Sequence, residues 1–187
     1  LDKVYGNVEP RVLSLDQPQE FSSESDDKEY GGTITVRRTD TAVEVRLTST
    51  TPEQDDKDGW VMWFDFRAPE DRLLPAGQGR FPLIVDLKRG RLRRFDEFAG
   101  GTIPVVDLHA TDDGYVVRIP YSEIRQLTGR DPDTFDLAAE IELWKHADQR
   151  RMFQSAPITQ RRDPWRQGMA TFVLRGEARP ALAPMAE

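Results

Sequence analysis

The sequence predicts an all-β protein, an antiparallel two-sheet β-sandwich of about ten strands with one short helix. Apolar residues recur at every second position in many short segments, which is the period of a half-buried strand. Turn-forming clusters such as T111-D-D-G114 and D131-P-D133 separate these segments. The sequence has no repeat of fixed length, which argues against a propeller or a solenoid.

The first two strands, residues 33–38 and 42–49, are expected to form a hairpin around the turn T39-D-T41. Seven later strands follow the same alternation: 81–87, 91–95, 105–110, 115–120, 137–146, 152–156 and 169–174. The one predicted helix covers residues 122–127. Pro120 stops the strand before this helix, Ser122 is expected to cap it and Gly129 to end it.

The remaining strand, residues 60–67, is the most aromatic part of the chain. At a period of two, Trp60, Met62, Phe64 and Phe66 share one face, which we assign to the core. Val61, Trp63, Asp65 and Arg67 share the other face. Because a core rarely holds a carboxylate without a partner, we interpret this second face as a candidate site for a ligand.

The 187 residues are sufficient for one domain with a substantial core. We expect a partly irregular N-terminal extension over residues 1–32, the sandwich over 33–174, and a disordered tail or linker over 175–187.

The composition argues against several classes of function. A net charge of −7, from 33 acidic and 26 basic residues, is unfavourable for nucleic-acid binding. No apolar run approaches the roughly 20 residues of a membrane span. Without cysteine there is no thiolate nucleophile or metal ligand. The basic run K88-R-G-R-L-R-R94 is either a solvated hairpin or a patch for uronate, sulfate or phosphate groups.

The strand at 137–146 provides a second candidate face. Its apolar positions alternate with Glu140, Glu142, Trp144 and His146, so those four share the opposite side. An aromatic ring beside carboxylates and an imidazole suits a sugar, which stacks its CH groups on the ring and offers its hydroxyls as hydrogen-bond partners. The alternative is that another segment covers Trp63 and Trp144.

Two further groups lie in expected loops. Trp165 is flanked by arginines, and either packs on the sheet or binds a ligand with Arg166 as the nearest donor. Asp55, Asp56 and Asp58 could ligate Ca²⁺, since hard cations take several oxygen ligands, although a solvated turn would also explain them. Calcium is the only candidate cofactor that these carboxylates suggest.

Three stretches in this order carry a family resemblance: G59-W-V-M-W-F-D-F-R67, D113-G-Y-V-V-R-I-P-Y-S-E-I124 and P164-W-R-Q-G-M-A-T-F-V-L174. Together they resemble the family 9 carbohydrate-binding modules and the wider DOMON-like group of β-sandwiches. The middle stretch is the most specific, since Pro120, Tyr121, Ser122 and Ile124 all fall where the pattern requires them. The resemblance spans about residues 33–174.

The resemblance implies a non-catalytic carbohydrate-binding module, an accessory domain of a larger extracellular or periplasmic protein, with calcium common in the family. Its partners would be a polysaccharide or oligosaccharide and other domains of the parent protein. The predicted sugar contacts are Trp63, Asp65, Glu142, Trp144, His146, Trp165 and Arg166. No catalytic residue is predicted.

Three other functions remain open at this stage. One is an enzyme acting on an acidic polysaccharide, which would need a cleft that brings the basic run 88–94 near Glu140 and Glu142. A haem-binding DOMON-type domain would use Met62 with His146 or Lys145, but strand parity places Met62 on the core face. A structural or interaction domain would cover the aromatic face with a partner. Burial of both Trp63 and Trp144 in the isolated chain, with no cleft beside them, would argue against sugar binding.

Overall fold

A computed structural model describes residues 11–22, 31–49, 59–72, 78–93, 103–146, 149–155 and 170–176. The strands in the first half of the described chain are β1 Arg11–Leu13, β2 Gln19–Ser22, β3 Gly31–Arg38, β4 Ala42–Ser49, β5 Gly59–Asp65, β6 Arg80–Asp86 and β7 Arg91–Arg93. Those in the second half are β8 Asp107–Thr111, β9 Gly114–Pro120, β10 Thr134–His146, β11 Gln149–Ser155 and β12 Ala170–Val173. A 3₁₀ turn, η1, covers Pro69–Asp71, and the helix α1 covers Tyr121–Thr128.

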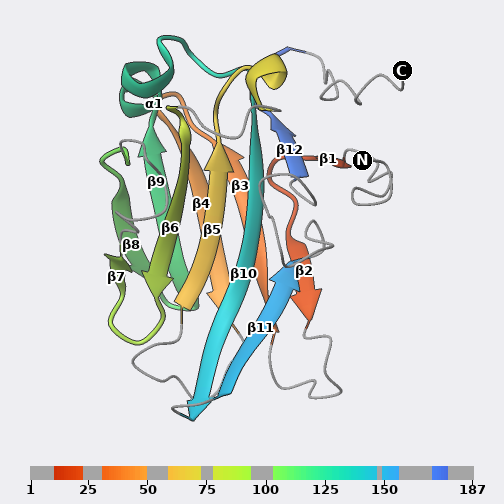
Figure 1. Ribbon diagram of the computed structural model, residues 1–187, viewed down its shortest axis with the longest axis vertical. Coiled ribbons are helices and arrows are strands. Elements are labelled where there is room, and N and C mark those ends of the chain that lie inside the picture. The colour runs from red at the N-terminus through yellow and green to blue at the C-terminus, as the bar shows by residue number, and fades with distance from the viewer. Residues whose placement is uncertain are drawn as a thin grey trace.

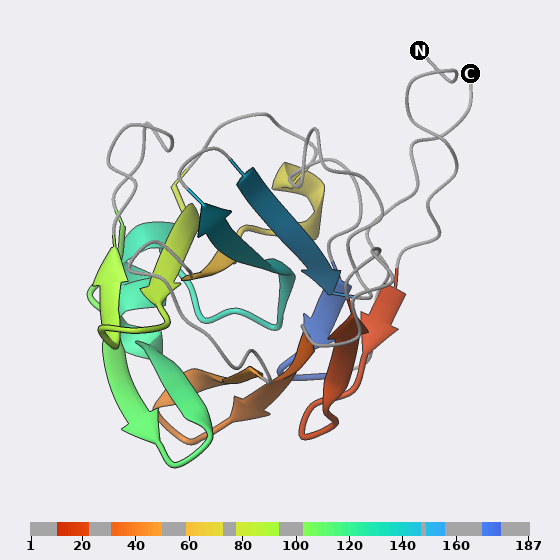
Figure 2. The same ribbon diagram turned by 90° about the horizontal axis from the view of Figure 1, so that it is seen from below.

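The strands form a β-sandwich whose two layers are joined along one side. The hydrogen-bonded order is β7-β6-β5-β10-β11-β2-β3-β4-β9-β8, and β12 pairs with both β10 and β1. Figures 1 and 2 show that this path bends over the core, so that β5, β6 and β10 lie across from β3, β4 and β9. The predicted two-sheet sandwich with one short helix is therefore confirmed. Among the described strand pairs only β1 and β12 are parallel.

The core lies between the layers and is formed by the alternate residues that parity predicted. Trp60, Met62, Phe64 and Phe66 are all fully buried. Stacked phenylalanines fill the end of the sandwich near η1, where the ring centroids of Phe66 and Phe135 are 4.8 Å apart. Large rings of this kind contribute much of the apolar area that folding removes from water.

Two local features differ from expectation. Strands β1 and β2 lie within the stretch expected to be partly irregular, and both are hydrogen-bonded to the sheet. The helix begins at Tyr121, its cap residue is Pro120, and no side chain caps it, so the predicted Ser122 cap is wrong. The reason is tertiary, because the Tyr121 N–H donates to the Thr41 carbonyl in the β3–β4 turn. Gly129, with φ of 75°, ends the helix as expected.

Gly114 is required where β9 approaches β4. A Cβ atom at this position would lie 2.0 Å from the carbonyl oxygen of Leu47, a backbone atom that cannot rotate away. We therefore expect Gly114→Ala to lower the free energy of unfolding by about 1–3 kcal/mol through overpacking. Urea unfolding measures the change. Gly176→Asn is the control, since nothing lies within 4 Å of its Cβ position and asparagine tolerates its left-handed φ of 74°, and an equal or larger loss in that variant would contradict the prediction.

Candidate functional site

The two layers differ in what they present to the outside. The outward side chains of β4 are polar, and one of them, Arg46, forms an exposed ion pair with Asp113 of the β8–β9 turn at 2.8 Å. The outward face of β5 and β6 is instead covered within the single chain, since Val61 is 3% exposed and Ile84 is 4% exposed. Trp63 lies on this covered face and remains partly exposed. It is therefore the large aromatic ring of this face that a ligand can reach.

The neighbours of Trp63 in the sheet are a proline and an alanine, both of them buried. The register pairs Trp63 with Pro82 on β6 and with Ala138 on β10. Both are compact side chains, so none of the bulky residues of these strands lies directly beside the indole. β7 pairs with β6 only from Ile84 to Asp86. Pro82 therefore lies where β6 has no outer neighbour among the described strands, so the missing backbone N–H of proline costs no hydrogen bond there.

One row further along the same face lies a buried ion network, formed by Asp65, Arg67, Arg72, Arg80 and Asp136. Asp65 is 1% exposed and accepts two hydrogen bonds from the Arg67 side chain, at 2.9 Å from Nε and 2.8 Å from Nη2. Arg80 Nε lies 3.2 Å from the same carboxylate. Paired arginine donors of this kind orient a carboxylate strongly. Asp65 is therefore fixed, with its acceptor oxygens directed at arginines.

Arg72 connects this part of the network to β10. Its guanidinium donates to Asp136 Oδ1 at 2.7 Å and to both the carbonyl and the hydroxyl of Thr134 at 2.8 Å. Its Nε donates to the Arg67 carbonyl at 3.0 Å. The four acceptors surround the planar fork, so the side chain has one orientation.

Burial has a measurable electrostatic consequence at Asp136. It raises the pKa of the Asp136 carboxyl above its ordinary value of 3.8, since the charged form is desolvated. The charge of Arg72 and the hydroxyl of Thr171, which donates to Asp136 Oδ1 at 2.7 Å, lower the pKa, and the charge of Asp65 raises it further. Because the pKa of Asp136 is raised, the Arg72–Asp136 pair is expected to weaken as the pH falls toward that pKa.

The local sequence explains why the chain places two arginines here. After β5 the Phe66 N–H donates to the Gly79 carbonyl at 2.8 Å, which closes the loop back onto the start of β6. Pro69 opens η1, a position at which its missing N–H costs nothing. The turn directs Arg72 back toward β10. Residues 66–72 thus cross the ends of the strands next to Trp63.

The predicted site residues divide into three groups. Trp63 and Asp65 lie on one face of β5, as parity predicted, but Asp65 differs from expectation because it is buried and bound by arginines instead of facing solvent. Glu142, Trp144 and His146 lie on β10, the direct neighbour of β5, where the description extends to their backbone. Trp165 and Arg166 lie outside the described residues, as do Asp55, Asp56 and Asp58.

The register shows that Trp144 and Trp63 are not side by side. Trp63 pairs with Ala138, six residues before Trp144, which corresponds to about 20 Å along a strand. Glu142 pairs with Gly59, at the beginning of β5. The strands are neighbours in one sheet, as the matching faces suggested, but Trp144 lies beyond the part of β10 that pairs with β5.

Two observations bear on the cofactor hypotheses. Met62 is fully buried on the core face, as strand parity predicted for the haem alternative. Within the described part of the chain, no three histidine, aspartate or glutamate side chains come together to hold a metal ion.

In the same part of the chain no helix is long and apolar enough to cross a membrane.

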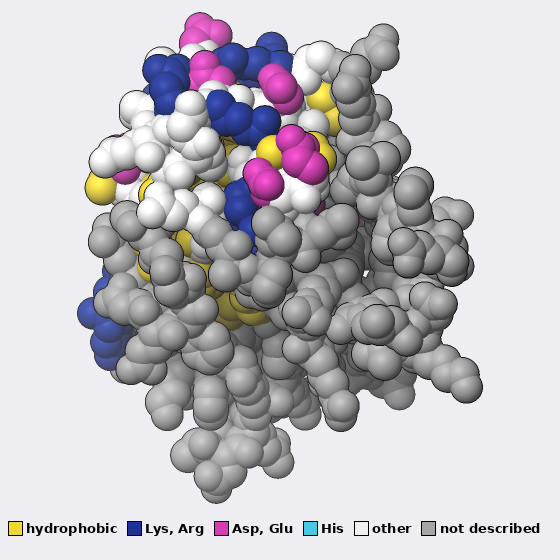
Figure 3. Space-filling model, turned by 45° about the horizontal axis from the view of Figure 1, so that its top comes forward, with side chains coloured by type: hydrophobic (Ala, Val, Ile, Leu, Met, Phe, Trp, Pro, Cys, Tyr) yellow, Lys and Arg dark blue, Asp and Glu magenta, His cyan; other side chains and the backbone are white. Residues whose placement is uncertain are grey.

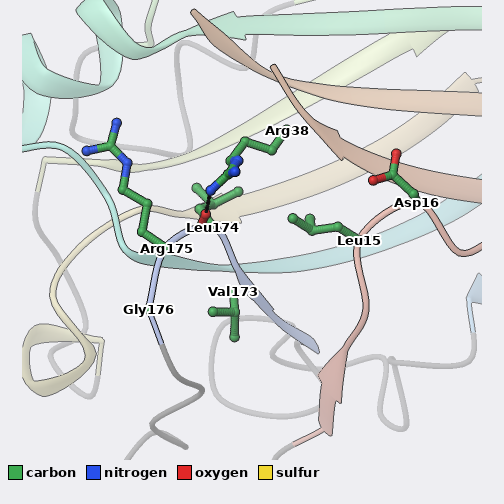
Figure 4. Close-up of a pocket in the computed structure, with 7 residues that line it drawn as sticks. All are labelled: Leu15, Asp16, Arg38, Val173, Leu174, Arg175 and Gly176. Carbon is green, nitrogen blue, oxygen red and sulfur yellow. Dashed lines mark hydrogen bonds between the residues drawn. The ribbon is translucent and has the colours of Figure 1, made fainter. Parts of the chain in front are cut away.

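Two hollows in the described part suit a sugar poorly. A cavity of about 340 Å³ lies between the β1–β2 connection, β3 and the end of β12 (Figure 4), but it has no aromatic ring, and Arg38 there donates to the Leu174 carbonyl. A cavity of about 290 Å³ is lined by Trp60, which is fully buried, and by Tyr115, whose hydroxyl donates to the Leu87 carbonyl at 2.6 Å. Figure 3 shows acidic and basic side chains interspersed at the α1 end of the molecule, with no patch of one sign.

Sequence reasoning missed most of the ion network. Arg72, Arg80 and Asp136 are polar residues in turns or at strand ends, where exposed charges are usual. Only Arg67 carried a signal, since its parity placed it on the face of Asp65. The partners of Arg72 are 62 and 64 residues away in the chain, so no local pattern reveals them.

Comparisons with known proteins identify the fold. No protein-family model and no curated protein sequence matches the chain. A solved family 9 carbohydrate-binding module from Caldicellulosiruptor kristjanssonii, in complex with cellotriose, superposes with a TM-score of 0.60 at 13% identity, over 98% of this chain and 97% of the other. A structure of a family 9 module from the same organism with glucose gives 0.56 at 14% identity, over 95% and 90%. The chain therefore has a β-sandwich like that of family 9, as the sequence motifs suggested.

Proposed function

We propose that this chain is a non-catalytic carbohydrate-binding module that recognises an oligosaccharide or polysaccharide at the outward face of β5. The observation that carries the proposal is Trp63, a partly exposed ring between Pro82 and Ala138 on a face that is otherwise covered. Two structures of the same fold contain cellotriose and glucose, so glucose-based oligosaccharides are the first ligands to test. We also propose that the module is an accessory domain of a larger exported protein, as the family resemblance of the sequence implies.

The chemistry of the face fits a sugar. A pyranose presents CH groups on one side, which stack on an indole ring, and hydroxyls at its edge. In the proposed complex one sugar ring lies on Trp63, bordered by the ion network. Asp65 then acts indirectly, since its carboxylate holds Arg67 and Arg80 in place.

The remaining predicted contacts extend this proposal along β10. Glu142, Trp144 and His146 would bind more distant sugar units of a longer chain, because their backbone positions lie well beyond the row of Trp63. Trp165 and Arg166 stay proposed contacts, and Asp55, Asp56 and Asp58 stay a proposed calcium site. Affinity should be modest, since a single exposed ring buries little of a ligand.

The competing hypothesis is an interaction domain whose aromatic face a partner covers. No partner is needed to cover Val61 and Ile84, because both side chains are already buried in the isolated chain. The criterion set by the sequence, burial of both tryptophans, is not met, since Trp63 is partly exposed. This favours a ligand that is small enough to contact one ring.

Trp63→Ala is expected to weaken cellotriose binding at least tenfold, which corresponds to about 1.4 kcal/mol. The reason is the loss of the stacking surface, while the surrounding Pro82 and Ala138 remain. Isothermal titration calorimetry measures the affinity, and quenching of tryptophan fluorescence provides an independent signal.

Trp63→Phe is the matched control, because it keeps an aromatic face and should retain most of the binding. An unchanged affinity in Trp63→Ala would rule out this ring as the binding surface. If the wild-type chain binds no glycan in an array of neutral and acidic sugars, the interaction-domain hypothesis replaces the proposal.

A further inference from the structure

The cavity of about 340 Å³ between the β1–β2 connection, β3 and the end of β12 is large enough for a small molecule. Its described wall contains two arginines, Arg38 and Arg175, and one carboxylate, Asp16. Both arginines are exposed, so a ligand can reach them from solvent. Figure 4 shows Arg38 extending from β3 toward Leu174, and Leu15 pointing into the same space. The cavity therefore combines accessible guanidinium groups with an aliphatic surface.

The carboxylate of this wall already has a partner, whereas Arg38 has none of that kind. Asp16 Oδ1 lies 3.1 Å from Arg37 Nε, and the Asp16 N–H donates to the Val36 carbonyl at 2.8 Å. Arg38 donates through Nη1 to the Leu174 carbonyl, and no described carboxylate lies within 4.0 Å of its guanidinium. Because a guanidinium has five N–H donors, Arg38 keeps several of them for an acceptor in the cavity.

The second arginine of the wall, Arg175, is held weakly. Its Nη1 lies 3.4 Å from Asp131 Oδ2, while Arg125 donates to Asp131 Oδ1 at 2.9 Å and 2.6 Å. If Arg175 turned away, Asp131 would therefore keep the stronger of its two partners. Arg175 can move toward an anion without leaving a carboxylate unpaired.

Arg175 also covers a buried hydroxyl. Tyr121 is 6% exposed, its hydroxyl has no hydrogen-bond partner among the described residues, and Arg175 Cζ lies 5.6 Å from its ring centroid. Burial raises the pKa of the Tyr121 phenol, the charges of Arg175 and Arg38 lower it, and that of Asp131 raises it. Both arginines of the cavity thus act on this hydroxyl. An unpaired buried polar group of this kind is typical of a place where an ion or a water molecule binds.

We propose that this cavity binds a small aliphatic carboxylate, whose oxygens accept hydrogen bonds from Arg38, Arg175 and the Tyr121 hydroxyl. Arginine suits a carboxylate because its planar fork donates to both oxygens. As Arg175 turns from Asp131 to the ligand, it uncovers the Tyr121 hydroxyl, which gains the acceptor that it lacks. The carbon chain of the ligand lies on the partly exposed apolar residues of the wall, which include Leu15 and Val173.

Titration calorimetry with hexanoate, in a buffer without other carboxylates, is the first test. Hexanoate should bind at millimolar concentration, and hexan-1-ol, which has the chain without the charge, should not. Glucuronate carries a carboxylate on a hydroxylated ring and should bind about fivefold more weakly than hexanoate. Absence of hexanoate binding overturns the proposal. Equal or tighter binding of glucuronate would overturn the aliphatic class of ligand.

Arg38→Gln locates the binding to this cavity. It removes the charge and part of the donor fork, so it should weaken hexanoate binding about tenfold. Arg46→Gln is the matched control, because Arg46 is an exposed arginine that pairs with Asp113 and does not line the cavity. This variant should bind hexanoate within about twofold of the wild type. Equal losses in the two variants would mean general attraction to positive charge and would overturn the site.

Tyr121→Phe separates binding from stability. It should weaken hexanoate binding about fivefold, while the urea midpoint without ligand stays the same or rises, since the removed hydroxyl has no partner among the described residues. Should Arg38→Gln fail to fold, a folded Tyr121→Phe variant with unchanged hexanoate affinity would overturn the site, and a weakened one would support it. None of these outcomes depends on cellotriose, so this proposal and the proposed function fail independently.

Discussion

Asp65→Ala is expected to destabilise the fold by about 3–5 kcal/mol, because it leaves two buried arginines without their carboxylate. Arg67 and Arg80 are 5% and 8% exposed, and both donate to Asp65. Removing one partner of a buried ion pair costs more than the pair contributes, since the remaining charge stays desolvated. Urea or thermal unfolding followed by circular dichroism measures the loss.

Asp113→Ala is the control for this prediction. Asp113 also binds an arginine through both oxygens, but the pair with Arg46 is exposed, and such pairs contribute little because water screens them. The unfolding midpoint should therefore shift far less in Asp113→Ala than in Asp65→Ala. Equal shifts in the two variants would mean that the buried network does not stabilise the fold.

The second large effect is expected at Trp60, which lies three residues before Trp63 and on the opposite face of β5. Trp60 is fully buried in the core, and Trp→Ala substitutions in cores cost about 3–5 kcal/mol through lost apolar burial and the cavity left behind. Urea unfolding should show this loss directly.

The comparison between the two tryptophans tests the assignment of faces. Trp63→Ala should reduce stability less than Trp60→Ala, because the Trp63 side chain is already partly exposed to water. It should reduce sugar binding more than the folded fraction of Trp60→Ala does. The reverse order of the two stability losses would show that the faces of β5 have been exchanged, since a shift of one residue in register turns every side chain over.

Much of the fold was predictable because its signals are local. Alternation in residues 42–49 predicted β4 with its bounds, the turn T39-D-T41 predicted the β3–β4 hairpin, and T111-D-D-G114 predicted the turn between β8 and β9. Gly129 ends the helix because glycine readily adopts the left-handed backbone conformation found there, which is a local property of the residue. Ser122 failed as a cap because a distant carbonyl, that of Thr41, satisfied the first N–H instead.

The candidate site was predictable only in part. Parity alone assigned Trp63 and Asp65 to one face, and the structure adds that Trp63 is the residue of this face that stays partly exposed. Which residues stand next to them depends on pairing with β6 and β10. That pairing placed Pro82 and Ala138 beside the ring and Trp144 about 20 Å away along the strand.

The sequence by itself determined the class of fold and the core face of β5, and it placed Trp63 on the opposite face of that strand. These follow from the alternation of side chains at a period of two, which can be read within a single short segment. Only the tertiary structure decided that Asp65 is a buried anchor and that Arg72 reaches Asp136, 64 residues away. The physical reason is that register between distant strands, and the burial it causes, result from packing of the whole sandwich, and no single segment encodes them.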